Sequence, residues 1–113
     1  MNTGDRGYRI GSDYVLWHNN IPSNIYVGVG AGNGTSTATE NTFVGNLAGN
    51  GITTGVHNTF IGQGAGLSNT MGFNNVFTGE SSGTTNTEGD QNVAIGHSAG
   101  PELATPLAIT IRL

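Results

Sequence analysis

The sequence predicts an all-β fold: a β-solenoid (β-roll or β-helix) of stacked 17-residue coils, with two short strands in each coil. Three observations carry this prediction. A motif that begins with asparagine recurs every 17 residues along most of the chain. β-Branched and aromatic residues, which favour strands, follow that asparagine at fixed positions. The chain of 113 residues contains 20 glycines and is only 9% charged, which suits turns better than helices.

The repeat divides the chain into four parts. We expect a flexible lead-in at 1–6, an N-terminal capping repeat at 7–23, β-solenoid repeats at 24–100 and a C-terminal capping strand at 101–113. The first repeat departs from the consensus, as the terminal unit of a stack must, and Tyr14 and Trp17 are expected to cover its open end. The last residues alternate apolar and polar side chains, which is typical of a half-buried strand.

An aromatic residue stands at the third position of each of the four regular copies: Tyr26, Phe43, Phe60 and Phe77. The positions on either side are Val, Ile or Thr, so the short strand is mostly apolar on both faces. The coil itself can cover one face, and the other face needs a partner. The aromatic row is therefore predicted to lie either in the core or at an interface between chains.

Two sets of residues are predicted to be structural. The first consists of turn glycines that need a positive φ or lie too close to another backbone for a side chain: Gly28, Gly45, Gly62, Gly79 and Gly96. The second consists of asparagines whose amides form a ladder along the stack: Asn24, Asn41, Asn58, Asn75 and Asn92. The small pairs such as Ala48-Gly49 predict a second tight corner in each coil.

Composition argues against several classes of function. The net charge is −4 and the only cations besides histidine are three arginines, so no basic stripe is available for nucleic acid. The chain has no cysteine for disulfides or thiolate chemistry. It also has no apolar run that would predict a signal peptide or membrane insertion.

No catalytic, cofactor or metal site is predicted. The glycine-rich segments lack the spacing of phosphate-binding loops. The three histidines, His18, His57 and His97, occupy different positions of the repeat. Glu80, Glu88 and Asp90 gather in one copy, where they could bind calcium or form a solvated acidic patch, and we favour the patch.

One polar row is a candidate for facing a ligand: Ser36, Thr53, Thr70 and Thr87. The alternative is ordinary turn chemistry, in which Ser and Thr hydroxyls bond to nearby backbone, and this interpretation is favoured.

The motifs from Asn41 to Gly49, Asn58 to Gly66 and Asn92 to Gly100 resemble the β-roll repeats of trimeric autotransporter adhesin heads. The 17-residue form is more similar to repeat regions of phage-type tail-fibre and related bacterial surface proteins. The resemblance implies a homotrimer: a non-catalytic fibre segment, structural or receptor-binding, on a virion, a cell surface or otherwise outside the cell. It implies a cell-surface glycan or protein as the receptor.

Two rival functions remain open. One is ice binding by a solenoid with a threonine-rich face. The other is glycan cleavage by a tailspike-like enzyme, for which Glu80, Glu88 and Asp90 are the only candidate carboxylates and which ranks lowest, because hydrolysis needs two positioned carboxyl groups.

Overall fold

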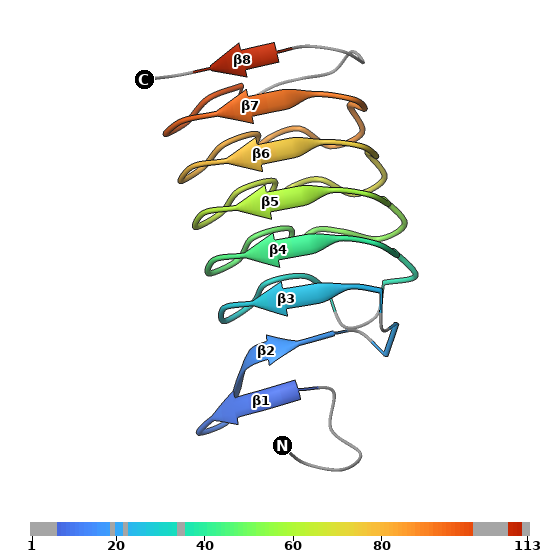
Figure 1. The fold of residues 1–113 in the computed structure, drawn as a ribbon, viewed down its shortest axis with the longest axis vertical. Coiled ribbons are helices and arrows are strands. Elements are labelled where there is room, and N and C mark those ends of the chain that lie inside the picture. Colours follow the sequence, from blue (N-terminus) through green and yellow to red (C-terminus); the bar gives the residue numbers. More distant parts are fainter. Residues whose placement is uncertain (1–6, 19, 22, 34–35, 101–108, 112–113) are drawn as a thin grey trace.

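The computed structural model describes residues 7–18, 20–21, 23–33, 36–100 and, for the backbone alone, 109–111. These residues form one eight-stranded sheet in which the strands lie in chain order, and the described part contains no helix (Figure 1). The strands are β1 (Gly7–Ile10), β2 (Asp13–Trp17), β3 (Ile25–Val27), β4 (Thr42–Val44), β5 (Thr59–Ile61), β6 (Val76–Thr78), β7 (Val93–Ile95) and β8 (Ile109–Ile111).

Strands β3 to β7 are parallel and pair at the repeat spacing. Phe43 pairs with Phe60 and Phe60 with Phe77, so equivalent residues of successive coils lie directly above one another. Parallel strands need a long connection, and here the remainder of each coil supplies it. The predicted β-solenoid is thus confirmed.

The prediction of two strands per coil is wrong for the part that the structure describes. Each regular coil contains one three-residue strand, and the rest consists of turns. These turns still bond from coil to coil, as between the Gly49 amide and the Ala65 carbonyl (2.9 Å) and between the Thr53 amide and the Thr70 carbonyl (2.9 Å). The backbone bends at left-handed residues such as Leu47 (φ 61°), so these bonds do not form a continuous strand ladder.

The N-terminal end is closed by a hairpin rather than by a coil. Strands β1 and β2 are antiparallel, and β2 is antiparallel to β3. At the other end, β8 continues the parallel stack beside β7. The predicted lead-in at 1–6 and most of the predicted closing segment at 101–113 lie outside the described residues.

The core is a column of stacked rings. Tyr26, Phe43, Phe60 and Phe77 are fully buried, and their successive ring centroids are 5.2, 4.8 and 4.9 Å apart. Trp17 meets the Tyr26 ring edge-on at 5.0 Å, which confirms its expected role in covering the N-terminal end. Offset and edge-on ring contacts of this kind add to the stabilisation that burial provides.

Four of the predicted turn glycines, Gly28, Gly45, Gly62 and Gly79, have a positive φ and also lie too close to another backbone for a side chain, and Gly96 has a positive φ of 119°. Gly45 has a φ of 136°, and a Cβ built on it would lie 2.5 Å from the carbonyl oxygen of Gly62 in the next coil. Gly62 has the same relationship to Gly79. The coils approach each other too closely at this corner for any side chain.

Candidate interaction face

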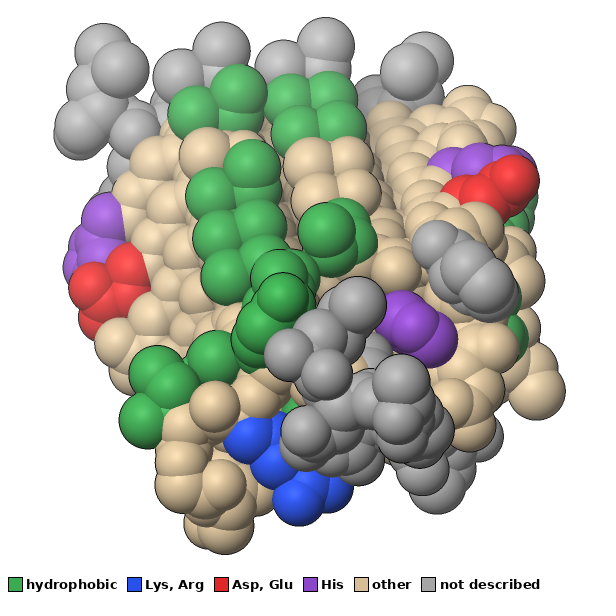
Figure 2. All heavy atoms as spheres, turned by 60° about the horizontal axis from the view of Figure 1, so that its bottom comes forward, with side chains coloured by type: hydrophobic (Ala, Val, Ile, Leu, Met, Phe, Trp, Pro, Cys, Tyr) green, Lys and Arg blue, Asp and Glu red, His purple; other side chains and the backbone are tan. Residues whose placement is uncertain are grey.

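The outer side of strands β3 to β7 forms one face of the solenoid, which we call the sheet face. Its residues are those on either side of the buried third position, in two parallel rows: Ile25, Thr42, Thr59, Val76 and Val93, and Val27, Val44, Ile61, Thr78 and Ile95. Figure 2 shows hydrophobic side chains of this face in two columns. All of these residues are β-branched.

The sheet face is accessible and carries no charge. Ile25, Ile61, Val76 and Ile95 are exposed, with Ile25 at 46%, and the remaining members are half-buried. None of the side chains ionises, and threonine hydroxyls are the only polar groups. This chemistry suits burial against another apolar surface.

The aromatic row does not contribute to this face. Tyr26, Phe43, Phe60 and Phe77 were candidates for either core or interface, and the structure places all four in the core of their own chain. Burial raises the pKa of the Tyr26 hydroxyl to about 12, with the Ser36 side chain opposing the shift. The apolar residues left for an interface are their neighbours along each strand.

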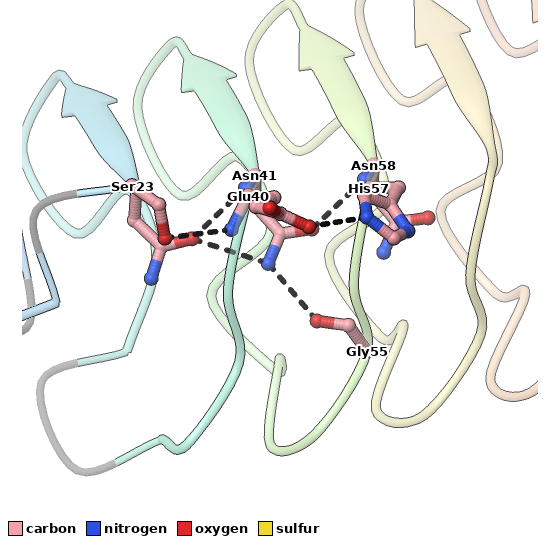
Figure 3. Close-up of polar contacts among 7 residues, drawn as sticks. Ser23, Glu40, Asn41, Gly55, His57 and Asn58 are labelled. Atoms are coloured by element: carbon pink, nitrogen blue, oxygen red, sulfur yellow. Dashed lines mark hydrogen bonds and ion pairs between the residues drawn. The ribbon is translucent and has the colours of Figure 1, made fainter.

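The predicted asparagine ladder runs along the inside of the coils (Figure 3). The Asn41 Oδ1 accepts from the backbone amide of Asn58 (2.9 Å), and the Asn41 Nδ2 donates to the carbonyl of Gly55 (2.9 Å). The Asn58 Oδ1 accepts in the same way from the amide of Asn75 (3.0 Å). The Asn41 and Asn58 side chains thus satisfy backbone groups both of their own coil and of the next, so the ladder is structural.

An exposed pair lies next to this ladder. The Nε2 of His57 contacts the Oε2 of Glu40, and the Glu40 amide donates to the Ser23 hydroxyl at 3.2 Å (Figure 3). Glu40 and His57 both have a φ of 57°. The spacing of 17 residues between Glu40 and His57 equals the repeat period and is the sequence signal for this pair. An exposed pair of this kind contributes little to stability.

The three carboxylates Glu80, Glu88 and Asp90 are divided between two segments of the coil. Glu80 lies two residues after the end of β6, whereas Glu88 and Asp90 lie together in the segment before β7. The Asp90 Oδ1 accepts from the backbone amide of Phe73 at 2.9 Å, so this carboxylate has a structural role. Within the described residues, no group of three or more His, Asp or Glu side chains could hold a metal ion.

Two hydroxyls of the threonine row bond to the backbone of the next coil. The Thr53 hydroxyl donates to the carbonyl of Thr70 (3.0 Å), and the Thr70 hydroxyl donates to that of Thr87 (3.1 Å). Thr53 and Thr87 are exposed, and Ser36 and Thr70 are half-buried. These carbonyls are 17 residues away, in the next coil, so the prediction of bonding to nearby backbone is wrong for Thr53 and Thr70, although both hydroxyl protons are engaged by backbone.

One interior row was missed by the sequence reasoning. Ile52, Asn69 and Asn86 occupy equivalent positions in three coils and are buried. Asn86 bonds to Gly89 through both its Nδ2 (3.1 Å) and its Oδ1 (2.8 Å). The Nδ2 and Oδ1 of Asn69 have no hydrogen-bond partner in the structure. The sequence does not indicate that this row is buried, because its members are not all apolar: one is Ile and two are Asn.

No protein-family model, curated protein or solved structure matches this chain. In the described residues, no helix is long and apolar enough to cross a membrane.

Proposed function

We propose that this chain is a structural or receptor-binding segment of a homotrimeric fibre, either a phage tail fibre or a bacterial surface adhesin, in which the sheet faces of three copies pack together. The exposed, uncharged sheet face is the observation that carries the proposal. The proposal assigns no catalytic step to the chain. It places the fibre on a virion or a cell surface.

Physical chemistry supports a partner for the sheet face. Isolated apolar side chains are normal on a protein surface, but a contiguous set over several strands marks an interaction site. Burial of apolar area contributes about 25 cal/mol per Å², and uncharged residues bring no desolvation penalty for ions. The resemblance of the repeats to adhesin heads and tail-fibre segments favours copies of the same chain as the partner.

In such a trimer the turns would remain on the outside. A cell-surface glycan or protein receptor would then contact turn residues such as Thr54, Met71 and Thr85, which are exposed. Receptor binding is thus assigned to the turns, and assembly to the sheet face.

The test is the solution mass of the chain by size-exclusion chromatography with light scattering. We expect three times the 11.5 kDa chain mass for the native protein. Ile61→Lys places a charge on the sheet face and should give a folded monomer. Met71→Lys adds the same charge at an exposed turn residue and should leave the trimer intact. A native protein that is monomeric at all accessible concentrations would refute the proposal.

Ice binding is a second candidate function, and one observation favours it. The sheet face presents two regular rows of β-branched side chains, and successive members of a row are about 4.8 Å apart, the spacing of neighbouring strands. The Thr53 and Thr70 hydroxyls, in contrast, donate to backbone carbonyls of the next coil. The sheet face rather than the threonine row would therefore bind ice. Thermal hysteresis of a monomeric native protein, abolished by Ile61→Lys, would favour this function over the fibre.

A further inference from the structure

We infer that the N-terminal hairpin is part of the interface between chains as well as an end cap, with Tyr8 and Leu16 packing against the same residues of neighbouring copies. The inference rests on the proposed trimer and extends its contact surface beyond the repeats. We call Tyr8, Ile10 and Leu16 the cap patch.

The strand register places the cap patch on the same side as the sheet face. Leu16 pairs with Val27 across β2 and β3, and directly paired residues point to the same side of a sheet. Val27 belongs to the sheet face, so Leu16 extends its row by one strand. Tyr8 pairs with Leu16 across β1 and β2 and extends the row by another.

The other side of the hairpin is already occupied. Trp17 pairs with Tyr26 and packs on its ring, inside the solenoid. Tyr14 stacks on Trp17 with centroids 5.8 Å apart, and the Arg9 guanidinium lies 4.4 Å from the centre of the Tyr14 ring. The register shift after Tyr8 in the β1–β2 pairing lets Tyr14 and Trp17 share this inner side. The hairpin thus covers the core with one side and leaves the cap patch on the other.

The three side chains of the cap patch are exposed to solvent, although covering the core does not need exposed apolar side chains. Tyr8 is 48% exposed, Leu16 is 36% exposed and Ile10 is 73% exposed. Figure 2, turned so that the N-terminal end comes forward, shows that hydrophobic side chains continue from the columns of the sheet face onto this end. The exposed carboxylate of Asp13 lies at the hairpin turn opposite Ile10, at the rim of the patch.

The size of the sheet face gives a reason for the hairpin to take part. Five strands of three residues cover a projected area of only about 240 Å², whereas a stable interface buries about 800 Å² on each partner. Two additional strands of four and five residues enlarge the projected face by more than half. Three parallel copies around a threefold axis would bring the hairpins to the same level, so the occupant of each cap patch is the cap patch of another copy.

The first experiment compares Leu16→Lys with Met71→Lys in the full chain. Sedimentation equilibrium should show that Leu16→Lys weakens the trimer at least tenfold, whereas Met71→Lys leaves the association constant within twofold of native. The fluorescence of Trp17, the only tryptophan, reports whether the hairpin still packs on Tyr26. A folded Leu16→Lys variant that trimerises like the native chain would overturn the inference and leave the proposed trimer standing.

A second experiment uses crosslinking and does not depend on whether the Leu16→Lys variant folds. The chain has no cysteine, so Leu16→Cys and Met71→Cys each introduce a single thiol. A short bis-maleimide should link chains through Cys at position 16 and not through Cys at position 71. Trimers that do not crosslink at position 16 would refute the role of the hairpin, whereas a monomeric native chain would refute the proposed function itself.

Discussion

Gly66 lies directly against the ring of Phe60, six residues earlier in the same coil. A Cβ built on Gly66 would be 2.4 Å from the Cε2 of Phe60, well inside van der Waals contact. The same contact recurs in the other regular coils, between Tyr26 and Gly32, Phe43 and Gly49, and Phe77 and Gly83. The second corner of each coil therefore needs glycine to make room for the ring as well as for its backbone conformation.

Gly66→Ala should destabilise the protein by about 3 kcal/mol or more, because it adds steric conflict with Phe60 to the cost of a left-handed residue. Gly64→Ala is the matched control. Gly64 has a similar φ of 65°, but its Cβ would approach only the Ser81 hydroxyl, at 3.9 Å. Urea unfolding should give a loss of about 1 kcal/mol for this control. Equal losses for the two variants would show that the Phe60 ring is not the constraint.

Asn58→Ala should cost about 2–5 kcal/mol, because it leaves buried backbone groups without partners. The affected groups are the Asn75 amide, which donates to the Asn58 Oδ1, and the Gly72 carbonyl, which accepts from the Asn58 Nδ2 at 2.8 Å. Asn46→Ala removes an exposed amide that donates to the Val29 carbonyl, and should cost under about 1 kcal/mol. Similar midpoints in urea for both variants would contradict a special role for the buried ladder.

Asn69→Ile should stabilise the protein by about 1 kcal/mol, because an unpaired buried amide is replaced by an apolar side chain. Ile52 occupies the equivalent position one coil earlier, so the coil can hold this side chain. Asn86→Ile provides the opposite case. It removes two hydrogen bonds to Gly89 and should be destabilising. A lower melting temperature for Asn69→Ile would mean that the Asn69 amide has a partner in solution, such as an internal water.

The free energy of unfolding should fall at alkaline pH because of the raised pKa of Tyr26. Its pKa is raised from 10.0 in the unfolded chain to about 12 in the fold, so the unfolded state releases its proton first as the pH rises. The contribution is fully present below pH 10 and is lost as the pH approaches 12, by roughly 2 kcal/mol. Tyr26→Phe, which copies the next three coils, should remove this part of the pH dependence. Parallel curves of unfolding free energy against pH for the native and variant proteins would contradict the prediction.

The solenoid could be predicted because each coil has the same kinds of residue at the positions that form its strand and its turns. Period, strand position, the asparagine ladder and the glycines at the first corner, such as Gly45 and Gly62, all follow from residues that recur every 17 positions. The hairpin at 7–18 could not be predicted in this way, because its residues depart from the repeat and their antiparallel pairing depends on the end of the stack that they cover.

The sequence also could not predict which apolar row faces the interior of the coil and which faces outward. Phe60 and its neighbours Thr59 and Ile61 all suit a strand, and alternation alone places them on opposite sides without saying which side is interior. The ring of Phe60 fits inside because Gly66 makes room for it, and this contact exists only once the coil has closed.

By itself, the sequence determined the coil length, the parallel stacking and the rows that run along it, because a fixed period brings equivalent residues into register whatever the details of the turns. Only the tertiary structure decided that the aromatic row is the core, that Asn69 is buried without a partner, and that Leu16 and Tyr8 continue the outer face. These features depend on which side of the backbone a closed coil encloses, and closure is a property of the whole stack.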